Sequence, residues 1–221
     1  MDFLNTLVQP LVQGANYLLR NPNTVWPLFV QHLALTGLAL LISLLVAGPL
    51  SVLVARVAWL RGPVLGVLGV IYTIPSLALF VLLIPFTGLG TTSATIALVA
   101  YAQLVLVRNM VIGLTTIDPS IIEAARGMGM SSWQRFARVE LPLALPLTLA
   151  GTRLAALSII AIGTVAAYIN AGGLGRLLFD GVATGNRGKI VAGSLVVSLL
   201  AVLVNLILRY FERRATRAVM G

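Results

Sequence analysis

Long apolar segments, separated by short polar stretches, make up most of this chain. Five of them lie at about residues 32–55, 63–84, 93–114, 143–169 and 190–208. An α-helix rises about 1.5 Å per residue, so segments of this length can cross a hydrocarbon core of roughly 30 Å. The pattern therefore predicts an all-α integral membrane protein with about five transmembrane helices.

Composition agrees with this prediction. Of the 221 residues, 59% are hydrophobic and 10% are charged, with a mean hydropathy of +1.02, whereas soluble domains have about 25% charged residues. Cysteine is absent, which excludes disulfides, thiolate metal sites and cysteine nucleophiles. His32 is the single histidine and cannot supply a metal cluster alone. We expect neither a metal site nor a bound cofactor.

The N-terminal segment, residues 1–31, differs from the spans. Residues 3–20 carry apolar pairs near the helical period, interrupted by Pro10 and Gly14. This pattern predicts a surface-lying helix that is broken midway, followed by a turn at residues 21–23. The segment has no positive region before its first apolar stretch and no small-residue cleavage site, so we expect no removable signal peptide.

Residues 118–142 form the longest polar break in the chain. Asp118 is a suitable N-cap and Pro119 suits the first helical position, so a short helix should begin there and end at the glycines that follow. Ser131, with a glutamine three residues later, predicts a capping box that starts a second helix, which Pro142 should close. The loop is therefore predicted to be a helix-turn-helix between two spans.

The same loop resembles a known motif. Glu123-Ala124-Ala125, three residues, Gly129, nine residues, Val139, one residue and Leu141-Pro142 follow the spacing of the EAA loop of ABC-importer permeases. The departure is Val139, where the motif usually has isoleucine. The resemblance implies the type I importer fold, with the first helix acting as a cytoplasmic coupling helix in a cleft of the ATPase. The implied ATPase-coupling residues are Glu123, Ala124, Ala125, Gly129, Leu141 and Pro142.

Further stretches resemble the osmoprotectant permeases, which handle glycine betaine, choline and carnitine. They are 74–79 with 84–85, 107–109, 124–130 leading to 139–146, and 171–175. Asn170 departs from this subfamily, which often has glycine there. Methionine or other amino-acid permeases are the nearest alternative, because they resemble this chain in size, span count and the Ala-Gly-Gly-Leu-Gly stretch.

The resemblance also implies the partners. This chain would be one half of a homodimeric or heterodimeric pore in the bacterial inner membrane, with a cytoplasmic ATPase dimer and an external solute-binding protein. ATP would bind the partner and not this chain, which would not be an enzyme. Consistent with that, residues 185–189 (Gly-Asn-Arg-Gly-Lys) lack the spacing of a phosphate-binding loop.

Positive charges predict the orientation. The net charge of +9 does not indicate nucleic-acid binding, because the cations sit at the ends of apolar segments. With the EAA loop inside, nine arginines are cytoplasmic and four cations are external, which places the N-terminus outside and the C-terminus inside. The inner set is Arg56, Arg61, Arg126, Arg135, Arg138, Arg209, Arg213, Arg214 and Arg217; the outer set is Arg20, Arg176, Arg187 and Lys189.

This topology divides the chain into the segment 1–31, a permease domain at 32–208 and a basic cytoplasmic tail at 209–221. Two further arginines, Arg108 and Arg153, fall within predicted spans, near their cytoplasmic ends. We expect both to snorkel to the interface or to pack within the bundle.

The second span has a polar, helix-breaking interior at residues 72–76, which should face protein or a water-filled path. The translocation-path candidates are Tyr72, Thr73, Pro75, Ser76, Tyr101 and Asn109. Tyrosines could hold a quaternary ammonium by cation–π attraction, but within spans they more often pack, so selectivity is expected mainly from the binding protein.

A secondary transporter or channel subunit is the alternative from another class. Such transporters commonly have repeats and acidic residues within the membrane. The sequence has no convincing internal repeat and no acidic residue in the predicted spans.

Overall fold

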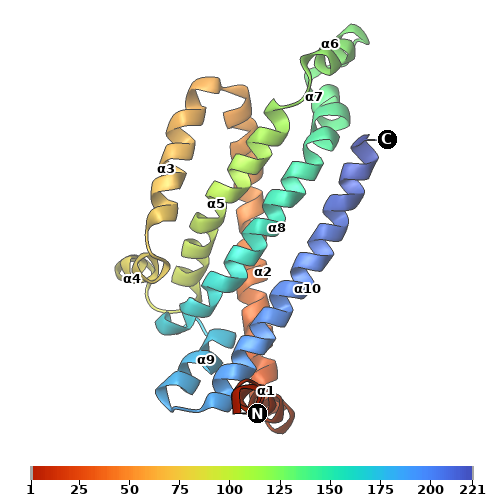
Figure 1. Cartoon of the computed structure of the whole chain (residues 1–221). Helices are drawn as coiled ribbons and strands as arrows, with labels where there is room; N and C mark the ends of the chain where they lie inside the picture. The colour runs from red at the N-terminus through yellow and green to blue at the C-terminus, as the bar shows by residue number, and fades with distance from the viewer. Residues whose placement is uncertain (1, 221) are drawn as a thin grey trace. The chain divides into compact units, whose positions relative to one another are not determined.

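The computed structural model describes the backbone of residues 2–220 and the side chains of residues 8–219 (Figure 1). Helices and short connections account for this described part, which contains no strand. The all-α prediction is confirmed. The α-helices are α1 Asp2–Arg20, α2 Pro22–Arg56, α3 Arg61–Thr73, α4 Ser76–Thr87, α5 Thr91–Thr115, α6 Pro119–Gly127, α7 Ser132–Arg135, α8 Leu141–Val165, α9 Leu174–Ala183 and α10 Arg187–Met220. Three short helices join them: η1 Ala58–Leu60, η2 Phe136–Glu140 and η3 Ala166–Ile169.

Within the part of the chain that the structure describes, four helical runs are long and apolar enough to cross a membrane. They are α2, α5, the continuous run Ser132–Ile169 and most of α10, and a bent helix pair brings the total to five if it counts as one span. The predicted number of about five spans is therefore reached only if the bent pair is counted as one span. Its two parts, Ala58–Thr73 and Ser76–Thr87, are bent by 99°.

The helix-breaking interior predicted for the second span, residues 72–76, is confirmed, and the break is sharper than a kink within one continuous helix. The helix stops at Thr73 and restarts at Ser76, with Pro75 in an extended conformation at φ −55° and ψ 135°. A proline has no amide hydrogen to donate and disfavours a helical conformation in the residue before it. Ile74-Pro75 therefore ends α3, and α4 starts in a new direction.

The chain divides into two compact units. Unit 1 comprises residues 1–40, 74–99 and 157–203, and unit 2 comprises residues 41–73, 100–156 and 204–221. One apolar cluster of unit 1 is centred on Val25, Leu177 and Ala192, from α2, α9 and α10. Tyr17 and Leu18 of α1 pack against it, so the N-terminal helix is fastened to unit 1 at its C-terminal end.

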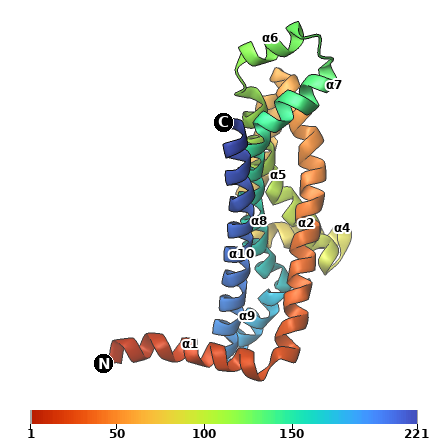
Figure 2. The same ribbon diagram turned by 90° about the vertical axis from the view of Figure 1, so that its right-hand side faces the viewer.

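The predicted break in α1 is absent, because the helix runs through Pro10 and Gly14. Gly14 lies against Val191 and the backbone of Ala192, so close approach to α10 supports this part of α1. Figure 2 shows α1 lying crosswise to the first turns of α2. The predicted turn at residues 21–23 shrinks to Asn21, because Pro22 already begins α2. The side chains of the first apolar pairs, residues 3–7, lie outside the described residues.

The stretch between the predicted spans 143–169 and 190–208 contains helix α9. Leu174 and Leu177 are buried in unit 1, and Leu178 lies against Gly193 of α10. Figure 1 shows α9 beside the first turns of α10. The helical spacing of these leucines was the signal that could have revealed α9. Residues 209–220, predicted as a basic tail, continue α10 as a helix.

Candidate functional site

Helix α6 begins as the sequence predicts. The Asp118 Oδ1 accepts a hydrogen bond of 2.8 Å from the Ser120 amide, and Pro119 is the first helical residue. This bond, together with one from the Ser120 hydroxyl, holds the pKa of the Asp118 carboxyl below its usual value. The helix ends at Gly127, and Gly129 adopts φ +77°, a left-handed conformation that glycine reaches without a steric penalty. The short helix and its glycine end are confirmed.

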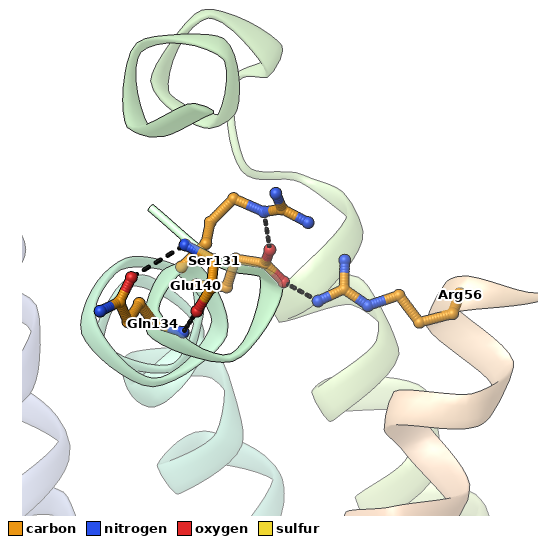
Figure 3. A network of polar contacts seen from close by, with 5 residues as sticks. Arg56, Ser131, Gln134 and Glu140 are labelled. Carbon is orange, nitrogen blue, oxygen red and sulfur yellow. Dashed lines mark hydrogen bonds and ion pairs between the residues drawn. The ribbon is translucent and has the colours of Figure 1, made fainter. Parts of the chain in front are cut away.

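The predicted capping box is also present. The Gln134 amide donates to the Ser131 Oγ at 3.2 Å, and the Ser131 amide donates to the Gln134 Oε1 at 2.8 Å (Figure 3). These reciprocal bonds start α7, which is separated from the end of α6 by four residues. The turn between the two helices is therefore held by local hydrogen bonds that the sequence spacing specifies.

Pro142 does not close this second helix, contrary to the prediction. The helical run from Ser132 passes Pro142 and continues to Ile169. Directly before Pro142 the chain forms a π-helical turn, Phe136–Glu140, in which the Leu141 amide donates to the Phe136 carbonyl. In a regular α-helix a proline lacks its hydrogen bond and crowds the carbonyl four residues earlier. The wider π turn is where this helix absorbs the misfit.

Glu140, the last residue of the π turn, is the centre of a buried ion cluster in unit 2. Its side chain is only 4% exposed. Its Oε2 accepts from the Arg56 Nη2, and its Oε1 accepts from the Arg135 Nε at 3.0 Å (Figure 3). Arg56 is the last residue of α2 and Arg135 the last of α7. This cluster was not predicted from the sequence; the available signal was an acidic residue at the end of the polar loop, directly before Leu141-Pro142.

The predicted coupling residues differ in exposure. Glu123 and Ala124 are exposed on α6, whereas Ala125 is buried at 1%. Leu141 and Pro142 are exposed at the start of α8. Large apolar side chains around α6 and α7 are exposed as well: Ile121 at 41%, Met128 at 69% and Trp133 at 72%. An acidic group beside exposed apolar residues is a surface suited to a protein partner.

The predicted path residues are only partly brought together. Tyr72 and Tyr101 meet in unit 2, with ring centroids 6.0 Å apart in an edge-on arrangement. Tyr101 is buried, whereas Tyr72 is 42% exposed. The Thr73 Oγ1 donates to the carbonyl three residues earlier at 2.7 Å. The Asn109 side chain donates to the Val105 carbonyl in its own helix at 2.8 Å.

The residues at the break between Thr73 and Ser76 are accessible. Thr73 and Pro75 are exposed, and Ser76 is half-buried. The expectation that residues 72–76 face protein or a water-filled path stays a prediction.

A pocket of about 790 Å³ lies within unit 1. Its polar lining includes Gln31, Thr91, Thr95, Asn170 and Arg176. The Gln31 Oε1 accepts from the Gly173 amide at 3.2 Å, which fixes the loop before α9. Asn170 has φ 61°. Asparagine is the side chain that best tolerates this left-handed conformation after glycine, so Asn170 keeps the backbone that a glycine would adopt there.

A second pocket, of about 700 Å³, lies within unit 2 and is almost entirely apolar. It is lined by residues of α2, α5, η2 and α8, including Pro49, Met110, Phe136 and Ala144. Arg56 also borders it. The apolar space therefore adjoins the Glu140 ion cluster.

The two arginines of the spans have different surroundings. Arg153 packs within unit 2, where its Nε donates to the Glu212 Oε2 at 2.7 Å and its Nη1 donates to the Asn205 Oδ1 at 3.3 Å. Arg108 is exposed and makes no ion pair with any residue that the structure describes. The expectation of packing in the bundle holds for Arg153.

Long apolar helices joined by an exposed, doubly capped helix-turn-helix are the architecture of a multi-pass membrane protein with a polar segment available to a partner. The profile of one family, described as "Binding-protein-dependent transport system inner membrane component", matches residues 39–217. The chain belongs to this family, whose members are the membrane-spanning permeases of ABC importers. The resemblance seen in the EAA loop is thereby confirmed.

Individual proteins of known name are also similar to this chain. The chain is 41% identical over 186 residues to the carnitine transport permease protein OpuCB of Listeria monocytogenes, covering 84% of this chain and 85% of that protein. It is 40% identical over 202 residues to the osmoprotectant import permease protein OsmW of Salmonella typhimurium, covering 89% and 94%. It is 34% identical over 190 residues to the choline transport system permease protein OpuBB of Bacillus subtilis, covering 86% and 88%.

Solved structures show the same fold. The MetNI methionine ABC transporter in an inward-facing conformation matches with a TM-score of 0.72 at 26% identity, covering 90% of this chain and 98% of that one. An amino acid ABC transporter matches with a TM-score of 0.68 at 20% identity, covering 97% and 99%.

Proposed function

We propose that this permease imports a quaternary-ammonium osmoprotectant of the carnitine, choline and glycine betaine class. The substrate class rests on the relatives, because the permeases at 34–41% identity described above are named for carnitine, choline or osmoprotectants. The methionine transporter shares the fold at a lower identity of 26%. Methionine or another amino acid is therefore the second candidate substrate.

The single observation that carries the mechanism is the exposed helix α6. It presents Glu123, a carboxylate without an ion-pair partner among the described residues, next to the small Ala124. A cytoplasmic ATPase dimer would receive α6, and the small side chain would allow close contact. ATP would be bound and hydrolysed by that partner, with this chain acting as a transport subunit and not as an enzyme.

The uninterrupted helical run Ser132–Ile169 supports transmission of the ATPase movement from α7 into the membrane-spanning helix α8. Because Pro142 does not break the helix, a displacement of α7 is carried into α8 without a flexible joint. The remaining partners would be a second permease subunit and an external solute-binding protein. The orientation that fits is a C-terminus and α6 in the cytoplasm and an N-terminus outside, as the arginine distribution indicates.

The test is uptake by the whole importer. The chain, tagged and expressed with its own ATPase and solute-binding protein in cells lacking osmoprotectant uptake, should support import of labelled carnitine, choline or glycine betaine and not of methionine. Copurification of the ATPase with the chain tests the partner directly. Uptake of methionine alone would overturn the substrate class, and a permease that transports without any ATPase would overturn the mechanism.

One variant tests the role of α6. Glu123→Ala should lower uptake by at least about five-fold, the low end of typical coupling effects, while the amount of permease in the membrane stays the same. Full uptake by this variant would show that Glu123 does not couple the ATPase to the pore.

A further inference from the structure

Three helices end at one buried carboxylate. Arg56 ends α2, Arg135 ends α7 and Glu140 ends the π turn before α8. We propose that Glu140 is a positioning residue that fastens the coupling segment, residues 119–135 of α6 and α7, to the end of α2. This inference rests on the proposed function of α6 as the helix that docks on the ATPase.

Both oxygens of Glu140 are occupied, each by a different arginine. The Oε1 accepts from the Arg135 Nε at 3.0 Å and the Oε2 accepts from the Arg56 Nη2. The exposed fractions of the side chains are 4% for Glu140, 11% for Arg135 and 47% for Arg56. Charge-assisted bonds are short and directional, and a buried carboxylate holds its partners because losing one leaves a charge without compensation.

The cluster joins parts of the chain that are distant in sequence. Arg56 and Glu140 are 84 residues apart, whereas Arg135 and Glu140 are five apart and belong to the same helical run. Arg135 therefore orients the carboxylate, and Arg56 carries the connection to another span. When α6 and α7 move, the end of α2 moves with them.

The π turn places Glu140 in this position. An extra residue in a helical turn rotates the side chains that follow, and such turns are frequent at functional sites. The turn spans Phe136–Glu140 and lies between the coupling segment and α8. It turns Glu140 toward Arg56 at the point where force from α7 enters the membrane-spanning helix.

Unit 2 also offers a matched control. Arg153 and Glu212 form an ion pair at 2.7 Å with side chains 24% and 22% exposed. This pair joins α8 to α10 and includes no residue of α6 or α7. If ion pairs in this unit act only through stability, neutralising Glu212 should have the same consequences as neutralising Glu140.

The first experiment measures solute transported per ATP hydrolysed by the whole importer in proteoliposomes. Glu140→Gln should lower this ratio by at least about five-fold, and Glu140→Asp should restore part of it. Glu212→Gln should leave the ratio within about two-fold of the wild type, as expected of a site outside the coupling network. Equal losses in the two glutamine variants, or no loss in Glu140→Gln, would overturn the inference.

A milder variant keeps the test decisive if Glu140→Gln fails to fold. Arg56→Gln removes the half-exposed partner and leaves Glu140 paired with Arg135. It should lower the same ratio. Where Glu140→Gln folds, combining the two changes should cost no more than Glu140→Gln alone, because both remove the Arg56–Glu140 interaction. An unchanged ratio in Arg56→Gln would overturn the inference.

The second experiment reads position without transport. The chain has no cysteine, so spin labels can be placed at Ser120 of α6 and at Trp59, both exposed. Glu140→Gln should broaden the distribution of label distances, whereas Glu212→Gln should not; an unchanged distribution in Glu140→Gln would overturn the clamp. This arm needs no ATPase. If the wild-type importer fails to couple, the proposed function fails, and the label distances still decide the role of Glu140.

Discussion

Arg153 of α8 donates from its Nε to the Glu212 Oε2 of α10 across 2.7 Å, and its Nη1 reaches the Asn205 Oδ1. Two of the chain's few charged residues are thereby neutralised against each other inside a helix bundle. The pair is about one quarter exposed on each side. Its energetic value therefore lies between that of an exposed ion pair and that of a fully buried one.

Removing one partner should destabilise the permease. We expect Glu212→Ala to lower the free energy of unfolding by about 1–3 kcal/mol, because Arg153 keeps its charge and loses its acceptor. Thermal unfolding of the purified chain in detergent measures the effect. Arg108→Ala is the matched control, since Arg108 is exposed and has no ion-pair partner among the described residues. Equal stability of the two variants would contradict the prediction.

The two glycines at the end of α6 should respond differently to alanine. Gly129 has φ +77°, and a side chain in the left-handed region costs about 1–2 kcal/mol. Gly127 has no such conformation and would find open space for a Cβ. We expect Gly129→Ala to lower solute uptake by displacing α6, and Gly129→Val to lower it further. Gly127→Ala should retain uptake, and a loss of the same size in Gly127→Ala would refute the role of backbone conformation.

Gly151 should not accept a larger residue. A Cβ added there would lie 2.6 Å from the Asn109 Cβ, so α5 and α8 would have to separate locally. We predict that Gly151→Val lowers the free energy of unfolding by about 1–3 kcal/mol, the usual cost of overpacking. Gly37→Ala serves as the control, because a Cβ there meets nothing within 4 Å. Denaturation in detergent distinguishes the two, and a stable Gly151→Val variant would disprove the close contact.

The residues at the break after α3 should be accessible to water. Single cysteines at Tyr72, Thr73, Pro75 and Ser76 should react with a water-soluble thiol reagent, and solute should protect at least one of them if they line the path. Leu106, which is fully buried, provides the unreactive control position. Absence of reaction at all four positions in every nucleotide state would place the translocation path elsewhere.

The arginine distribution predicts the orientation of the termini. A reporter fused after Met220 should be cytoplasmic, and one inserted at residues 184–186 should be external. Fusions with a phosphatase and with a fluorescent protein, each active on one side only, provide the measurement. The reverse pattern would also remove α6 from the reach of a cytoplasmic ATPase.

The local signals in the sequence were sufficient for most helices. Asp118 and Ser131 act through hydrogen bonds to amides two or three residues away, so their caps depend on adjacent residues alone. Apolar length located the membrane-spanning helices for the same reason. The spacing of the EAA motif around Gly129 was sufficient to recognise the family, because such a motif is read from the order of residues along the chain.

The prolines of this chain show where local sequence signals are insufficient to predict helix ends. Pro75 breaks the chain, as its covalent structure favours, whereas α1 continues through Pro10 and the Ser132–Ile169 run continues through Pro142. Each proline removes one hydrogen bond, and whether the helix survives depends on packing and on the turn before it. Those compensations, such as the contact of Gly14 with α10, come from distant residues.

Two of the ion pairs depended on the tertiary structure. Glu140 and Arg56 are 84 residues apart, and Arg153 and Glu212 are 59 apart. No local pattern distinguishes these partners from other charged residues of the chain. Local signals in the chain were enough to predict most helices and the family, because helix propensity, capping and apolar length act over a few residues. Only the fold decided which buried charges meet, because long-range electrostatic contacts exist only after the helices have packed.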